Sequence, residues 1–229
     1  MTPAESSASV ETLSERKYLR RLLQGLEPET PVVLVGSWAR GTSVSEWSDM
    51  DVLVIDDAQP PLPPPRIQVI AISAEDLKRR LAAGDDFPQW ALRFGKPVAG
   101  REAWERLRDE LLSDAPWPDP GAKIDQAKKK LETAETLLAM GDLAAAEEEV
   151  RFGLSHIARA ELLAHRVFPL SRPELAEQLQ EIGEGELASM MRRATSPDVM
   201  KEAEVREAVK RLRARLVSAG GAGNFRPGT

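Results

Sequence analysis

Residues 31–57 read PVVLVGSWARGTSVSEWSDMDVLVIDD, and the architecture of the first half of the chain follows from them. Two short runs, 32–35 and 52–55, are continuously apolar and rich in β-branched residues, which is typical of strands buried on both faces. The segment between the two runs is small, polar and acidic. We therefore expect two core strands, joined by a segment that carries the chemistry of the site.

The second strand is entered through Asp49-Met50-Asp51. Because side chains alternate across a strand, the two carboxylates point to the same face and repel each other unless a cation lies between them. An all-oxygen site with two carboxylates and room for water and phosphates is the kind that Mg²⁺ prefers. Gly36-Ser37, at the end of the first strand, lets a phosphate approach the backbone and offers N–H groups and a hydroxyl. These residues predict a metal–nucleotide site.

The spacing of these residues resembles a known signature. Gly36-Ser37, eleven further residues and then Asp49-x-Asp51, with Ala39-Arg40-Gly41 inside the gap, is similar to the motif of minimal nucleotidyltransferases (MNT) of the polymerase-beta-type superfamily. The gap is one residue longer than is usual in minimal members, and we place the added loop residue near 44–46. The resemblance covers residues 14–100, and it implies an α/β (α+β) domain with a short mixed sheet.

The resemblance also implies an activity and a set of roles. Asp49 and Asp51 would be the catalytic metal ligands, for Mg²⁺ (or Mn²⁺), and Gly36 and Ser37 would bind the nucleotide phosphates. The expected reaction moves a nucleoside monophosphate from a nucleoside triphosphate (NTP), ATP being the expected one, to a hydroxyl acceptor. Across the superfamily the acceptor is a protein, RNA or a small molecule, and the sequence does not specify which.

Gln68 departs from the family pattern. It lies in the expected third strand, 67–72, at the position that supplies a third carboxylate in the family. Glutamine can ligate a metal or form hydrogen bonds, but it cannot act as a base. One alternative is a regulatory module that binds a nucleotide without transferring it. The other, which we favour, is residual transfer with the help of a neighbouring acid, such as Asp56, Asp57 or Asp76.

Residues 113–121 mark the boundary between two domains, because three prolines and a glycine within nine residues exclude a helix or a central strand. We expect a nucleotidyltransferase-like domain at 14–112, a helical bundle at 122–218, and flexible ends at 1–13 and 219–229. In the bundle, apolar residues recur with helical spacing on both sides of Gly141-Asp142, which predicts two antiparallel helices joined by a short turn. Two further helices are expected at 172–179 and about 197–217.

The helical half resembles HEPN domains, in its Met140–Ala146 turn and in Arg151 and His156 on the following helix. Such domains are usually dimeric and often accompany minimal nucleotidyltransferases in toxin–antitoxin pairs. Many of them are ribonucleases that use an Arg-x4-6-His motif, which Arg151 and His156 match. The tyrosine that active toxin members carry two residues after the histidine is replaced here by Ala158.

Helix geometry argues against a simple Arg151–His156 pair. Five residues on an ideal helix rotate by about 140° and rise by about 7.5 Å, so the two side chains meet only if the helix kinks, for instance at Gly153, or if a partner chain contributes. The ordinary alternatives are an ion pair between Arg151 and Glu147, and a half-buried, packed His156. The ribonuclease hypothesis therefore stays open beside the transferase.

The composition narrows the class of protein. The chain has 42% hydrophobic and 30% charged residues, no cysteine and a net charge of −6. Neither half is basic, which makes generic nucleic-acid binding an unfavoured hypothesis. No apolar run approaches the roughly 18 residues of a membrane span, and no signal pattern is recognisable, so we expect a cytoplasmic protein without membrane contact. From the family resemblance we expect a homodimer through the helical domain.

Overall fold

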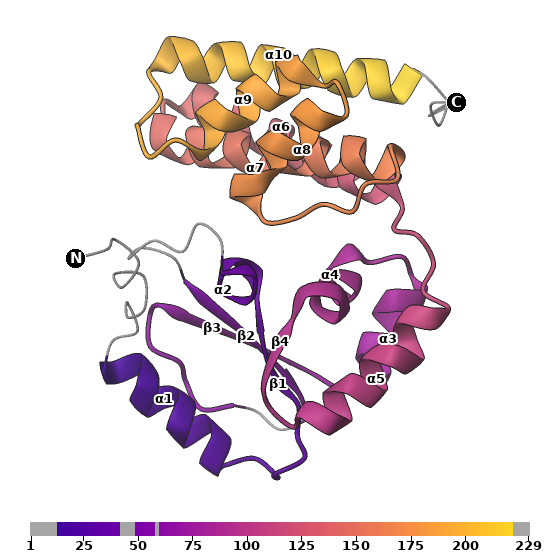
Figure 1. Ribbon diagram of the computed structural model, residues 1–229. Helices are drawn as coiled ribbons and strands as arrows, with labels where there is room; N and C mark the ends of the chain where they lie inside the picture. Colours follow the sequence, from indigo (N-terminus) through magenta and orange to yellow (C-terminus); the bar gives the residue numbers. More distant parts are fainter. Residues whose placement is uncertain (1–12, 42–48, 58–59, 222–229) are drawn as a thin grey trace, which may run out of the picture. The chain divides into compact units, whose positions relative to one another are not determined.

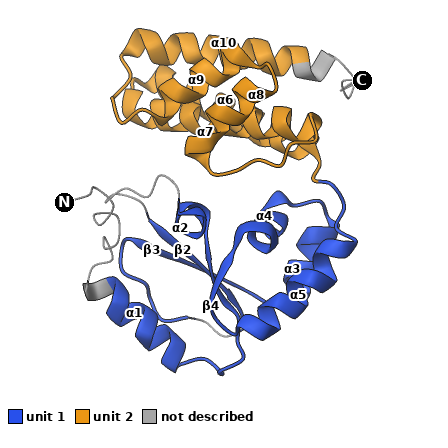
Figure 2. Cartoon of the chain, in the orientation of Figure 1, with its two compact units in different colours: residues 1–117 blue, residues 118–229 orange. Residues whose placement is uncertain are grey.

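The computed structural model describes residues 13–41, 49–57 and 60–221 (Figure 1). The chain divides between Trp117 and Pro118 into two compact units (Figure 2). This division falls inside the proline-rich stretch 113–121. The predicted flexible ends lie almost wholly outside the described residues, except that Leu13 begins the first helix and residues 219–221 end the last one. The added loop residue near 44–46 also lies outside them.

The first unit is a small mixed sheet with helices, which confirms the predicted α/β class. Its elements are α1 (Leu13–Gln24), β1 (Val32–Val35), α2 (Gly36–Arg40), β2 (Met50–Ile55), β3 (Ile67–Ile72), α3 (Ala74–Ala82), α4 (Asp86–Phe94), β4 (Lys96–Ala99) and α5 (Arg101–Ser113). The strand order is β3-β2-β1-β4. β2 pairs with β3 in parallel, and β1 pairs antiparallel with both β2 and β4. The three strands expected from the sequence are all present.

The two faces of β2 have different roles. Met50, Val52 and Val54 join a buried cluster with Tyr18 and Leu22 of α1, so α1 covers one face of the sheet. Since side chains alternate along a strand, Asp51 points to the opposite face. The apolar cluster under α1 therefore sets the orientation of Asp51, because a register slip of one residue would turn the carboxylate into that cluster.

The second unit is all helical. It contains α6 (Pro120–Met140), α7 (Leu143–Ala164), the 3-10 turn η1 (Arg172–Glu174), α8 (Leu175–Glu181), α9 (Gly185–Thr195) and α10 (Glu202–Gly221). The predicted turn between the first two helices is confirmed. Gly141 ends α6 in the left-handed conformation, at a φ of 81°, and the Asp142 side chain caps α7 by accepting from the backbone N–H of Ala145 at 3.1 Å.

The expected last helix, at about 197–217, corresponds to α10, but α10 begins later, at Glu202, and ends later, at Gly221. α9 was not expected, and residues 196–201 connect it to α10. The buried residues of α9 are Leu187, Ala188, Met191 and Ala194, a helical periodicity that the sequence contains. The helix expected at 172–179 is η1 followed by α8. Within the described residues, no helix is both long and apolar enough to cross a membrane.

Candidate active site

Strand pairing brings the predicted site residues of the first unit to one place. In the register of the sheet, Asp51 of β2 lies opposite Val35 of β1 and beside Gln68 of β3. Gly36 follows Val35 directly and begins α2, which packs against β1 and β2. Residues far apart in the sequence thus meet at the edge where β1 ends and β2 and β3 begin. We call Gly36, Ser37, Asp49, Asp51 and Gln68 the carboxylate site.

Position 36 must be a glycine because the Asp51 side chain lies against its backbone. Its φ of 67° lies in the left-handed region, where a Cβ is unfavourable. A Cβ placed on Gly36 would also collide with Oδ2 of Asp51. We expected this glycine to let a phosphate approach the backbone, but in the structure it is the Asp51 carboxylate that does so. The missing side chain therefore leaves room for the Asp51 carboxylate.

The electrostatics of the carboxylate site fit a bound cation. Asp49 is exposed and Asp51 is half-buried. Burial, followed by the negative charge of Asp49, raises the pKa of Asp51 from 3.8 to about 6. Within the part of the chain that the structure describes, no lysine or arginine forms an ion pair with Asp51. A hard divalent cation such as Mg²⁺, bound by these carboxylate oxygens, would stabilise the ionised form of Asp51.

α2 has only five residues, and contacts with the rest of the unit hold it in place. Ala39 is buried beneath it, and the guanidinium of Arg40 lies 5.0 Å from the ring centroid of Phe94 in α4. Gly41 ends the helix, where its N–H donates to the carbonyl of Ser37 at 3.0 Å. Ser37 is half-buried in the first turn, directly after Gly36. α2 therefore places Ser37 at the same edge of the sheet as Asp51.

The acids that we considered as replacements for the third carboxylate lie elsewhere. Asp56 and Asp57 follow the far end of β2, and five residues of strand separate Asp51 from Asp56 by about 16 Å. Asp56 instead accepts from the hydroxyl of Thr30 at 3.4 Å. Asp76 lies in α3, beyond the far end of β3, and pairs with Arg79 at 2.8 Å. The replacement hypothesis is therefore wrong for all three residues.

Arg151, the predicted ribonuclease residue, is occupied by structural contacts. Its Nε donates to Glu147 at 3.0 Å, which confirms the alternative ion pair. Its two other nitrogens donate to the backbone carbonyls of Ala194, Ser196 and Asp198. Those carbonyls belong to the end of α9 and the connection to α10. Arg151 thus fastens this connection to α7, a role that periodicity in the sequence does not reveal.

His156 is half-buried on α7. α7 is one continuous helix from Leu143 to Ala164. Gly153 has a packing reason instead, because a Cβ there would lie 2.7 Å from Cδ2 of Leu212 in α10. Ala158, at the position of the family tyrosine, is fully buried. The geometry therefore gives no support to a catalytic Arg151–His156 pair.

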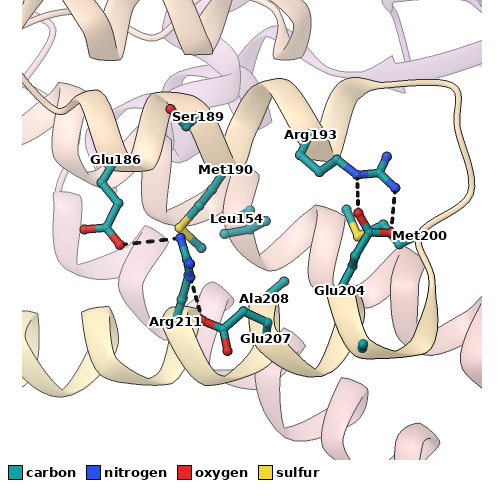
Figure 3. A pocket seen from close by; sticks show the side chains of 11 residues that line it. Leu154, Glu186, Ser189, Met190, Arg193, Met200, Glu204, Glu207, Ala208 and Arg211 are labelled. Carbon is teal, nitrogen blue, oxygen red and sulfur yellow. Dashed lines mark hydrogen bonds and ion pairs between the residues drawn. The ribbon is translucent and has the colours of Figure 1, made fainter.

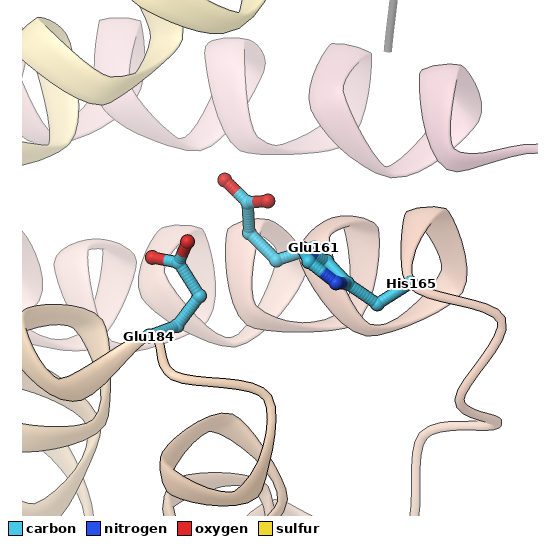
Figure 4. Close-up of side chains that lie close together, drawn as sticks. All are labelled: Glu161, His165 and Glu184. Atoms are coloured by element: carbon cyan, nitrogen blue, oxygen red, sulfur yellow. The ribbon is translucent and has the colours of Figure 1, made fainter. Parts of the chain in front are cut away.

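A second group of metal-ligating side chains occurs in the helical unit (Figure 4). One ligand atom from each of Glu161, His165 and Glu184 lies within 4.8 Å of the others. Burial raises the pKa of Glu161, and the nearby Arg215 opposes this shift. Arg215 donates to Glu161 at 3.4 Å and also to Glu184. Because Arg215 already pairs with both carboxylates, we interpret the group as an ion-pair network that ties α10 to α7.

The comparisons with known proteins gave distant structural likenesses. No protein-family model matches the chain, and no curated protein matches it. Among solved structures, the chain is similar to the crystal structure of a nucleotidyltransferase-like protein from Exiguobacterium sibiricum 255-15, with 15% sequence identity and a TM-score of 0.45. The match covers 88% of this chain and 74% of that one. A likeness this remote assigns neither a family nor an activity.

Proposed function

We propose that the first unit binds an NTP together with Mg²⁺ and transfers its nucleoside monophosphate to a hydroxyl acceptor. The observation that carries the proposal is the position of Asp51, which is half-buried, packed on Gly36 and beside Gln68, without an ion pair to any described residue. Asp49 and Asp51 would hold Mg²⁺ (or Mn²⁺). Gly36 and Ser37 would contact the phosphates, as the resemblance to minimal nucleotidyltransferases implies.

In this reaction the protein mainly positions the reactants and stabilises charge. The acceptor oxygen attacks the α-phosphorus, the bond to pyrophosphate breaks, and the acceptor proton passes to solvent or to a nearby base. Mg²⁺, when bound, would offset the charge on the phosphate oxygens and help to orient the attack. Gln68 cannot accept the proton of the acceptor hydroxyl. We therefore expect slow transfer, with the acceptor proton lost to water.

Calorimetric titration of the four NTPs with Mg²⁺, with pyrophosphate release followed in parallel, tests this proposal. Wild type should bind at least one NTP in a Mg²⁺-dependent way, and Asp49→Asn/Asp51→Asn should lose at least tenfold in affinity. Asp57→Asn is the matched control, because it removes an exposed carboxylate at the far end of β2. Wild type that binds no NTP, or a double variant that binds like wild type, would refute the site.

Gln68 favours a second candidate function, a regulatory module that binds the nucleotide without transferring it. The same titrations separate the two, because such a module binds an NTP and releases no pyrophosphate. Gln68→Glu sharpens the result, since it places a carboxylate beside Asp51 in the register of the sheet. Pyrophosphate release that appears only in this variant would mean that the glutamine has disabled transfer. If neither wild type nor Gln68→Glu releases pyrophosphate, a feature other than the glutamine prevents transfer.

For the helical unit we propose a homodimer and, from its resemblance to HEPN domains, a toxin–antitoxin context. Both rest on the family likeness of its sequence. Light scattering of the full chain at micromolar concentration tests the dimer, and a monomer would refute it. We do not extend the proposal to ribonuclease activity, because the guanidinium of Arg151 is occupied by Glu147 and three backbone carbonyls.

A further inference from the structure

The space between α9 and α10 is a pocket of about 550 Å³ within the helical unit (Figure 3). Each of these helices packs against α7, and they make little direct contact with each other. Leu154 of α7 forms the floor of the pocket. The side chains of Ser189, Ala203 and Ala208 are too short to fill the space, and Met190 and Met200 line the remainder.

An ion pair bridges the helices at each end of this pocket. Arg193 of α9 pairs with Glu204 of α10 at 3.1 Å, and Glu186 of α9 approaches Arg211 of α10 at 3.8 Å. Each helix thus contributes a glutamate and, seven residues later, an arginine. Since the two pairs connect opposite ends, the helices run antiparallel. Seven residues of helix rise by about 10.5 Å, which is the length of the slot between the bridges.

The interior of the slot is apolar and adaptable. Leu154 and Met200 belong to the buried core of the unit, and Met190 packs against that core. Unbranched methionine side chains change rotamer at low cost, so they fit occupants of different outline. Water in such a slot has few polar partners, and displacing it with an apolar group is favourable. The volume lies within the range of small-molecule sites in proteins.

The rim selects against charged occupants. Its two arginines are both paired, Arg193 with Glu204 and Arg211 with Glu207 at 2.8 Å. With Glu186 the rim carries three carboxylates and two guanidinium groups. An anion would face the carboxylates without a free cation, and a cation would compete with two arginines already in place. The bridges also exclude a helix, whose width of about 10 Å would require both ion pairs to break.

We propose that the slot between α9 and α10 binds an uncharged, mostly apolar small molecule. Its ends lie under the Arg193–Glu204 and Glu186–Arg211 bridges, and its body lies on Leu154 and the two methionines. The slot belongs entirely to the second unit. The proposal is therefore independent of nucleotide binding by the first unit.

Fluorescence titration of the full chain with N-phenyl-1-naphthylamine, an uncharged apolar dye, tests the site. Wild type should bind it saturably, and Ala208→Trp, which fills the slot, should weaken binding at least tenfold. Ser189→Phe fills the slot from α9 and should weaken dye binding to a similar extent. Ala144→Trp is the control, because it places the same side chain on an exposed position of α7. Thermal unfolding by circular dichroism verifies that each variant is folded.

Three outcomes would overturn the proposal. The first is wild type without saturable binding, and the second is binding that both filled variants retain. The third is equal binding of the anionic dye 1-anilinonaphthalene-8-sulfonate, which would contradict selection against charge. Light scattering tests the remaining possible occupant of the slot, a second copy of the chain. If wild type is a dimer and Ala208→Trp alone makes it monomeric, the slot receives a second copy of the chain and the small-molecule site is refuted.

Discussion

Asp51 and Arg151 are both charged, both removed from full contact with water, and held in opposite ways. Arg151 donates to one carboxylate and three backbone carbonyls, so its charge and its hydrogen-bonding capacity are used within the fold. Among the described residues, the charged group that acts on Asp51 is a second acid, Asp49, and the pKa of Asp51 is raised to about 6. A group that the fold satisfies is structural, whereas a group that the fold leaves uncompensated is poised for a ligand. The contrast separates the two candidate sites that the sequence presented side by side.

Arg151→Ala should have the largest effect on stability. Glu147 is 7% exposed, and it also accepts from the backbone N–H of Met200 at 3.1 Å. Removing the guanidinium leaves this carboxylate buried without its partner, which costs about 3–5 kcal/mol. Three carbonyls at the α9–α10 connection lose their donor as well. Urea unfolding monitored by circular dichroism measures the loss.

Binding of Mg²⁺ and NTP to the first unit should be unchanged in Arg151→Ala, assayed at low temperature where the variant is folded. A matched double variant, Glu147→Gln/Arg151→Met, removes both charges and should be less destabilised than the single one. If Arg151→Ala were as stable as wild type but abolished an RNA-cleaving activity, Arg151 would be functional and the contrast would fail.

Gly36→Ala should have the next largest effect on stability, because it forces Asp51 away from its position. A left-handed φ costs a non-glycine residue about 1–2 kcal/mol, and the collision with Oδ2 of Asp51 adds to it. Gly41→Ala is a close control, since Gly41 has the same φ of 67° and no atom within 4 Å of a Cβ placed there. We expect Gly36→Ala to be less stable than Gly41→Ala by about 1 kcal/mol and to lose Mg²⁺-dependent NTP binding. Equal behaviour of the two variants would show that Gly36 has a purely conformational role.

Asp51→Asn should stabilise the metal-free protein at neutral pH. The folded-state pKa of about 6 lies above the ordinary value of 3.8, so the folded chain binds the proton more tightly than the unfolded chain does. The stability that this provides is full below pH 3.8 and is lost as the pH rises through about 6. With allowance for solvent screening, the loss at pH 7 is about 1–2 kcal/mol.

Urea unfolding of wild type and Asp51→Asn from pH 4 to 7, without divalent ions, measures this difference. The wild-type curve should fall with pH relative to that of the variant. Mg²⁺ should restore wild type and leave the variant unchanged. A constant difference between the two proteins over this range would mean that Asp51 has an ordinary pKa.

The sequence predicted the parts of the fold that depend on strong local patterns. The strands of residues 32–35, 52–55 and 67–72, the Gly141-Asp142 turn and the alignment of Gln68 with the aspartates all depend on apolar runs, turn residues or spacing. α9 was not predicted although its buried residues recur with helical spacing, because Pro197 was interpreted as the start of the last helix.

Long-range side-chain contacts could not be predicted in the same way. The Gly36 backbone faces a carboxylate because β1 pairs with β2. Arg151 binds carbonyls 43 to 47 residues away because of the packing of the bundle. Sequence spacing does not contain either distance. The i,i+4 spacing of Glu147 and Arg151 did predict their ion pair, because that contact is local to one helix.

Gln68→Glu should have the smallest effect on stability and should sharpen the contrast further. Gln68 is exposed and lies beside Asp51 in the register, so a carboxylate there adds repulsion through solvent of high dielectric constant, worth about 0.5–1 kcal/mol. The metal-free variant should be less stable than wild type by that amount, and its affinity for Mg²⁺ measured by calorimetry should rise by about threefold to fivefold, because the same repulsion is relieved on binding. Ala71→Glu is the control, since Ala71 is also exposed on β3 but points to the other face near the far end of the strand. A variant that gained no Mg²⁺ affinity would mean that position 68 does not face the metal, and the protein ligands of the metal would then be Asp49 and Asp51 alone.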